Sequence, residues 1–180
     1  MSVDRPDIAV LNAMAHEDFV AALGDIYEHA AWVAEAAAPL RPFGDRDALA
    51  AAMARIVRDA DPALQTALLR AHPELGHRGP LAPESADEQR AQGIDRLAAG
   101  EAARLAALNA AYRERFGFPF IIAVRGQRDM AAIMTALERR LAGTPDDERR
   151  TALAEVCRIA GFRLARRVAA PAGSAVAFSE

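Results

Sequence analysis

Apolar residues recur at helical spacing along most of the chain. Leu105, Leu108, Tyr112 and Phe116 are three or four residues apart, the spacing that places side chains on one face of an α-helix. Such stripes, read together with start and stop signals, predict helices over residues 17–23, 28–38, 45–59, 61–72, 83–91, 101–116, 129–142 and 144–168. The pattern therefore predicts an all-α fold of about seven or eight helices.

Several of these helices carry clear boundary signals. Asp61 is a typical N-cap residue, and Pro62 follows at the first-turn position that proline favours. Gly117 follows the stripe that ends at Phe116, where a glycine commonly closes a helix. Thr144 precedes a proline and three acidic residues, which favours the start of the last helix at that point.

One apolar segment does not fit a helix. The sequence "FGFPFIIAV" (116–124) is aromatic and β-branched, and Pro119 interrupts it. A single strand would lack a partner, so we expect a short, buried, extended link between helices near 117–125. No repeat or domain linker is evident, and we expect one domain over 1–180, with a core of about 8–168 and a frayed tail at 169–180.

Composition excludes several classes of protein. Apolar residues make up 52% of the chain, but no apolar run approaches the roughly 20 residues of a membrane span. The net charge of −3 is spread over both signs, which argues against a nucleic-acid-binding protein. Cys157 is the only cysteine, so no internal disulfide can form. With no secretory signal at the N-terminus, we expect a cytoplasmic protein.

Unusual polar residues gather in "RAHPELGHRGPLAPESADEQRAQG" (70–93). His72 and His77 are five residues apart with Pro73 and Gly76 between them, which does not match a helical zinc pair, so we expect no metal site. His72 ends an apolar helical stripe. It is either a C-terminal cap or a general acid or base that titrates near neutral pH.

Three further polar residues lie on one predicted helical face. Ser85, Glu88 and Gln89 are at positions i, i+3 and i+4, which suits a capping box or a solvated surface as well as a binding site. Arg163 lies at the edge of the apolar stripe of the last helix. There it must reach water or bind an anion, and position alone slightly favours water. Asn109 flanks another apolar stripe and is open to a core hydrogen bond, a substrate contact or neither role.

Taken in order, these motifs resemble a known family. "HPELG" (72–76), "SADEQ" (85–89) and "LNAAYRERFGFPFIIAVRG" (108–126) are similar to motifs of the 2-oxo-4-hydroxy-4-carboxy-5-ureidoimidazoline (OHCU) decarboxylases. "LNAM", "YEHAAWVAEAA" and "RPF" near the N-terminus, and "EVCRIAGFRLARRV" near the C-terminus, extend the resemblance over about 11–168. The chain departs from the family pattern at Glu74, which is usually aspartate, and at 92–94, which is usually Ala-Gly-Leu.

The resemblance implies an enzyme that converts OHCU to (S)-allantoin and carbon dioxide during urate degradation. It implies an all-helical homodimer that uses no metal and no organic cofactor. The family's catalytic residues correspond to His72 and Glu88. Its substrate contacts correspond to the side chains of Ser85, Gln89 and Arg163 and to main-chain groups of Phe118, Phe120, Ile121 and Ile122.

Two other functions remain open at this point. The same fold acting on another ureido or hydantoin acid is one, because the chain departs from the family at Glu74 and Gln92. The other is a helical interaction module, in which Arg163 and the polar trio are ordinary surface groups.

Overall fold

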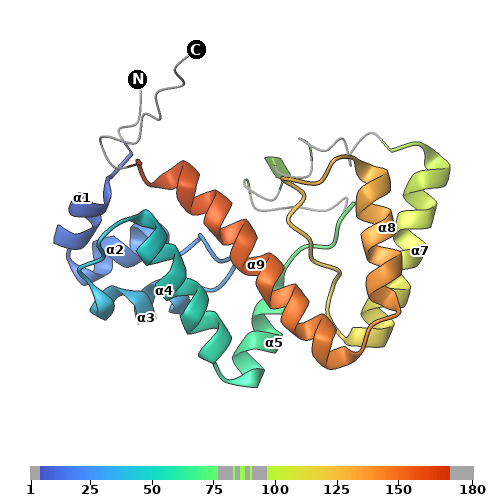
Figure 1. Ribbon diagram of the computed structural model, residues 1–180, viewed down its shortest axis with the longest axis horizontal. Coiled ribbons are helices and arrows are strands. Elements are labelled where there is room, and N and C mark those ends of the chain that lie inside the picture. The colour runs from blue at the N-terminus through green and yellow to red at the C-terminus, as the bar shows by residue number, and fades with distance from the viewer. Residues whose placement is uncertain (1–4, 77–82, 84–85, 88–89, 91–96, 171–180) are drawn as a thin grey trace, which may run out of the picture. The chain divides into compact units, whose positions relative to one another are not determined.

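The computed structural model describes residues 5–76, 83, 86–87, 90 and 97–170 (Figure 1). Within these residues the chain forms eight α-helices and one 3-10 helix, and no strand. They are α1 (Ile8–Ala13), α2 (His16–Leu23), α3 (Trp32–Ala37), η1 (Ala38–Leu40), α4 (Arg46–Asp59), α5 (Pro62–Ala71), α7 (Ala99–Phe116), α8 (Met130–Leu141) and α9 (Pro145–Arg167). The predicted all-α class is confirmed. None of the helices in the described part of the chain is long and apolar enough to cross a membrane.

The chain divides into two compact units. Unit 1 consists of Met1–Asp59 and Ala160–Glu180, and unit 2 of Ala60–Ile159. Helix α9 therefore contributes its first part to unit 2 and its last turns to unit 1.

Unit 1 has an apolar core contributed by α1–α4 and the end of α9. Its fully buried side chains include Leu11, Phe19, Leu23, Leu49, Met53 and Leu164. Asn12 ties α1 to residue 43 by two hydrogen bonds of 2.8 Å, one donated by its side-chain amide to the Phe43 carbonyl and one accepted from the Phe43 N–H. Because the side-chain amide satisfies both main-chain groups, the segment between η1 and α4 is held in place without regular structure.

The helix expected over 28–38 is wrong in its bounds. Helix α3 begins only at Trp32, and residues 38–40 continue as a 3-10 turn. His29 has a φ angle of 54°, a left-handed conformation that no α-helix can include. Helix α1 was not predicted at all, although Asp7 caps it by accepting a hydrogen bond from the Val10 N–H at 2.8 Å.

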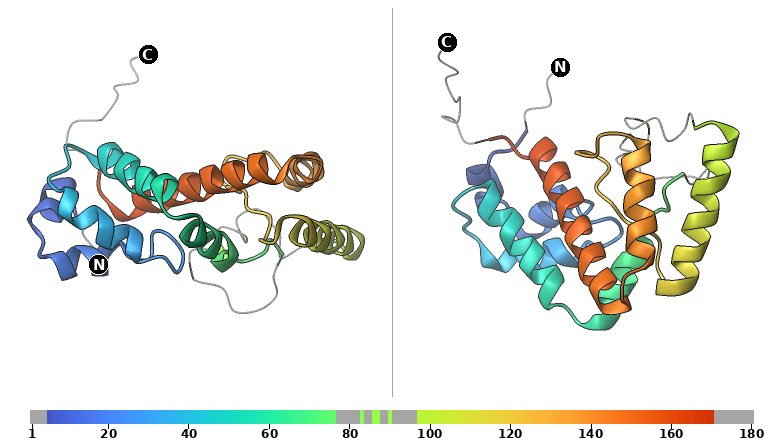
Figure 2. Two further views of the ribbon diagram at one scale, coloured as in Figure 1. Left: turned by 90° about the horizontal axis from the view of Figure 1, so that it is seen from below. Right: turned by 45° about the vertical axis from the view of Figure 1, so that its right-hand side comes forward.

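Unit 2 is built around α7 and α8, which lie side by side (Figure 2). The two helices run in the same direction, since Arg104 near the start of α7 pairs with Glu138 of α8 and Arg115 near its end hydrogen-bonds Gly143 beyond α8. Consecutive helices with the same direction need a connection that returns along their length. Residues 117–129 provide it without regular structure, which confirms the predicted link.

The predicted boundary signals of unit 2 are confirmed. The Asp61 side chain accepts a hydrogen bond from the Ala63 N–H at 2.7 Å, with Pro62 as the first residue of α5. Gly117 ends α7 in a left-handed conformation with φ of 78°, which favours glycine. The Thr144 hydroxyl accepts a hydrogen bond from the Asp147 N–H at 3.2 Å at the start of α9. Of the predicted helix over 83–91, the described residues 83, 86–87 and 90 are helical, and the rest lies outside the described residues.

Candidate active site

His72 ends α5 in an extended conformation, because Pro73 follows it and disfavours a further helical residue. The side chain is 7% exposed, and its Nδ1 lies 3.0 Å from the Leu68 carbonyl oxygen in the last turn of the helix. A carbonyl oxygen can only accept, so Nδ1 carries a hydrogen and the lone pair of the neutral ring is on Nε2. The helix-cap hypothesis for His72 is thus met by Nδ1, and this contact is compatible with an acid–base role for Nε2.

The turn that follows His72 is anchored to α7. The buried Asn109 donates its side-chain amide to the Leu75 carbonyl at 2.8 Å. One helical turn further along α7, Arg113 pairs with Glu74 at 2.5 Å. Glu74, where the family usually has aspartate, is therefore the residue that reaches α7. Within the described part of the chain, Asn109 Oδ1 is buried and has no hydrogen-bond partner, so a hydrogen-bond acceptor remains beside this turn.

The link that follows α7 is deeply buried. Phe118, Phe120, Ile121 and Ile122 are between 1% and 7% exposed. Among the described residues, the main-chain N–H groups of Phe120, Ile121 and Ile122 have no hydrogen-bond partner. More than about 90% of buried main-chain N–H groups in proteins are paired. Three consecutive unpaired donors therefore indicate a place that suits a hydrogen-bond acceptor.

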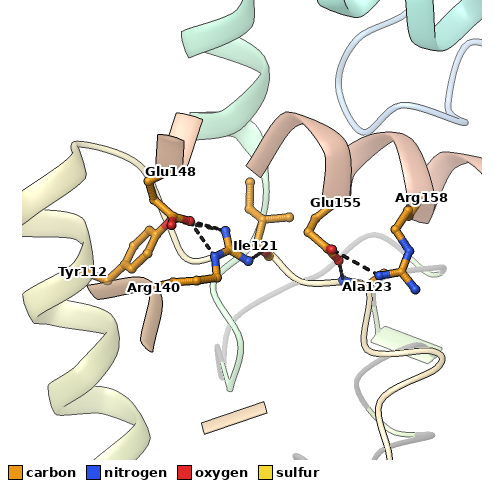
Figure 3. Close-up of polar contacts among 7 residues, drawn as sticks. All are labelled: Tyr112, Ile121, Ala123, Arg140, Glu148, Glu155 and Arg158. Carbon is orange, nitrogen blue, oxygen red and sulfur yellow. Dashed lines mark hydrogen bonds and ion pairs between the residues drawn. The ribbon is translucent and has the colours of Figure 1, made fainter. Parts of the chain in front are cut away.

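A buried polar cluster lies against the link (Figure 3). Arg140 donates from Nη1 to the Ile121 carbonyl at 2.7 Å and from Nε to Glu148 Oε1 at 2.6 Å. The Tyr112 hydroxyl donates to the same carboxylate oxygen at 2.5 Å. Burial, and then the hydrogen bond to Glu148, raise the pKa of Tyr112 far above its ordinary value, so the phenol remains a donor. Sequence reasoning did not identify this cluster.

Arg163 of unit 1 is 4% exposed, and its Nη2 lies 3.1 Å from Oε2 of Glu28, which is also 4% exposed. The expectation that Arg163 reaches water is therefore wrong, and the alternative, an anion partner, is correct. The reason is that Glu28, just before the left-handed His29, is brought to the same buried place from 135 residues away in the sequence.

The predicted site residues fall into three groups. His72 and the link belong to unit 2, whereas Arg163 belongs to unit 1. Ser85, Glu88 and Gln89 lie outside the described residues, as does His77.

The functional candidates that sequence reasoning missed share a signal that could have identified them. Arg140 and Glu148 are polar residues at helical spacing from buried apolar ones, three residues after Leu137 and four before Ala152.

Comparisons with known proteins bear on this arrangement. A family model described as OHCU decarboxylase matches residues 12–165. The "2-oxo-4-hydroxy-4-carboxy-5-ureidoimidazoline decarboxylase" of Haloferax volcanii is 46% identical over 157 residues, which are 87% of this chain and 93% of that protein. The chain belongs to the OHCU decarboxylase family. Another relative of the same name, from Halalkalicoccus jeotgali, is 44% identical over 160 residues, which are 89% of this chain and 90% of the relative.

A solved structure extends the likeness of this OHCU decarboxylase family member to three dimensions. The crystal structure of "(S)-allantoin synthase" is 33% identical, with a TM-score of 0.75. The match covers 91% of this chain and 54% of that one, so the chain spans about half of the solved protein. The fold and the family resemblance read from the motifs are thus confirmed.

Proposed function

We propose that this protein is an OHCU decarboxylase that converts OHCU to (S)-allantoin and carbon dioxide in urate degradation. The observation that carries the proposal is the buried link, whose three consecutive N–H donors have no partner among the described residues, in a chain that belongs to this family. The substrate ring carries carbonyl and ureido groups, and such donors suit its carbonyl oxygens.

The chemistry requires acid–base groups and no separate electron sink. The bond between the carboxylate carbon and the ring carbon breaks, and carbon dioxide leaves. The electron pair moves toward the neighbouring imine, which takes up a proton and gives an enol-like intermediate. The hydroxyl group then loses its proton as the ureido-bearing carbon gains one, so the anionic substrate consumes one proton overall. Because the imine accepts the electron pair, a cofactor such as PLP is not needed for this step.

We assign these proton movements to His72 and Glu88. The Nε2 atom of His72 is suited to take up and return a proton near neutral pH. Glu88 is assigned by its position in the family motif, and the two groups act as a coupled pair. Ser85 and Gln89 are assigned to the ureido and ring amides, and Arg163 to an anionic or carbonyl edge of the substrate.

Three further features belong to the proposal. The family resemblance suggests a homodimer in which each chain forms one catalytic domain. A cytoplasmic location is also part of the proposal, since a single cysteine suits a reducing compartment. Sedimentation of the purified protein tests the dimer directly.

Turnover of freshly generated OHCU, followed by the optical activity of the allantoin formed, tests the activity. His72→Asn is the sharpest variant, because the asparagine amide can still donate to the Leu68 carbonyl while Nε2 is lost. We expect His72→Asn and Glu88→Gln each to lose at least about 100-fold in kcat, the lower end of general acid–base contributions. His16→Asn changes an exposed histidine on α2 and serves as the matched control.

The outcomes separate the alternatives. Near wild-type rates in both site variants would refute the residue assignment. Turnover of another ureido or hydantoin acid without turnover of OHCU would favour a different substrate for the same fold. Failure of allantoin and related ureides to change the melting temperature would favour an interaction module, since a ligand that binds the folded state stabilises it.

A further inference from the structure

The main chain of the link is held at two points by side chains of other elements. Arg140 of α8 donates to the Ile121 carbonyl at 2.7 Å. Glu155 of α9 accepts a hydrogen bond from the Ala123 N–H at 2.7 Å (Figure 3). Ile122 lies between the two anchored residues. The link thus receives from side chains the hydrogen bonds that a neighbouring strand would give.

Each anchor is itself fixed by further contacts. The Arg140 guanidinium is held by Glu148 and lies over the Phe120 ring, with 4.6 Å between its Cζ and the ring centroid. Glu155 is 15% exposed and pairs with Arg158 at 3.2 Å, one helical turn along α9. Neither side chain can swing away from the link without losing a second interaction.

A need for stability alone does not account for this arrangement. Removing a guanidinium and a carboxylate from water costs free energy that their mutual attraction often fails to recover. Apolar side chains of similar volume would often stabilise the fold equally well. The charged groups also fix the position of the main chain, because hydrogen bonds at two neighbouring residues define where the residue between them lies.

We propose that Arg140 and Glu155 are positioning residues for substrate binding. By fixing Ile121 and Ala123, they hold the N–H groups of Phe120, Ile121 and Ile122, which no described residue pairs, where the substrate's carbonyl oxygen is received. This inference rests on the proposed function, and it adds two residues that need not contact the substrate themselves.

Glu155 offers the cleaner test. Glu155→Leu removes the acceptor for the Ala123 N–H, whereas Glu155→Gln keeps an oxygen acceptor at the same length. We expect Glu155→Leu to lower kcat/KM by about tenfold to 100-fold, because small displacements of binding groups have effects of that order. Glu155→Gln should restore most of the loss. Arg150→Gln breaks an exposed ion pair with Asp147 on the same helix and serves as the control, and its kcat/KM should match that of the wild type.

Amide hydrogen exchange without substrate provides a readout that is independent of activity. Exchange at 120–123 should be faster in Glu155→Leu than in the wild type and unchanged in Glu155→Gln and Arg150→Gln. If Glu155→Leu does not fold, Glu155→Asp gives the same comparison, because its carboxylate is one methylene shorter and keeps its charge.

The possible failures are distinguishable. No turnover of OHCU by the wild type overturns the proposed function, and the inference with it. Wild-type turnover that is retained in Glu155→Leu or Glu155→Asp overturns the inference alone. Equal losses in Glu155→Leu, Glu155→Gln and Arg150→Gln also overturn it, since they point to a general loss of structure.

Discussion

The Tyr112 hydroxyl offers a direct measure of how strongly the buried cluster stabilises the protein. Tyr112 is fully buried, and its hydroxyl donates to Glu148 at 2.5 Å, where the carboxylate is 3% exposed. Tyr112→Phe removes this donor and keeps the ring, which packs against Phe116 at 4.7 Å and Phe120 at 5.3 Å between centroids. The change therefore removes the hydrogen bonds of the hydroxyl, the short one donated to Glu148 and a longer one of 3.5 Å accepted from Arg140 Nη2, and keeps the packing of the ring.

The magnitude follows from the charge of the acceptor. A hydrogen bond to a charged group contributes about 1.5–3 kcal/mol, and its loss leaves a buried carboxylate with one donor fewer. Arg140 still pairs with Glu148, so we expect about 2 kcal/mol rather than the larger loss that follows when a buried charge has no partner. For a chain of this length, that corresponds to a fall of roughly 4–8 °C in melting temperature.

Urea unfolding followed by circular dichroism measures the difference between wild type and variant. The raised pKa of Tyr112 sets its pH dependence. A group whose pKa is higher in the folded state stabilises below its unfolded pKa and loses that contribution above it. The difference should therefore be constant between about pH 6 and 9 and should shrink above about pH 10. A difference below about 0.5 kcal/mol at neutral pH would refute the reasoning, since a buried charged hydrogen bond cannot be that weak.

Two other residues give predictions of a different kind. Glu28→Gln removes the carboxylate that pairs with the buried Arg163. The free energy of unfolding, measured in urea, should fall by about 3 kcal/mol, near the lower end for a broken buried ion pair. A fall below about 1 kcal/mol would mean that the pair is not essential to unit 1. Asp129→Ala removes the N-cap of α8, where hydrogen bonds from the main chain at Ala132, and then Arg128, lower the pKa of the Asp129 carboxyl from 3.8. Its stability relative to the wild type should be lower at neutral pH, and the gap should close as the pH falls below about 3.8, whereas a gap independent of pH would contradict the capping role.

Local signals predicted the helical boundaries where a single residue type has a single physical role. The Asp61–Pro62 start, the Gly117 end and the Thr144 cap depend on groups within a few residues of each other. The link was predictable because Pro119 and the lack of a partner strand exclude both regular structures. In each case the groups that decide the conformation lie close together in the sequence.

Features that depend on distant partners were not predictable in this way. The environment of Arg163 is set by Glu28, which is 135 residues away. The cluster at Tyr112 brings α7, α8 and α9 together at one carboxylate. Periodicity places such polar residues on an inward face but cannot say which charges meet there. His29 illustrates the same limit locally, because its left-handed φ is uncommon for a residue other than glycine.

The contact between His72 Nδ1 and the Leu68 carbonyl has a stereochemical consequence. In the proposed mechanism, a hydrogen bond from Nδ1 to the helix keeps the neutral imidazole in a single tautomer, so the protons that it exchanges pass through the opposite nitrogen. A proton delivered by one atom of a ring held in this orientation approaches a planar carbon from one side only. If His72 acts as proposed, the configuration of the product depends on the hydrogen bond that caps α5.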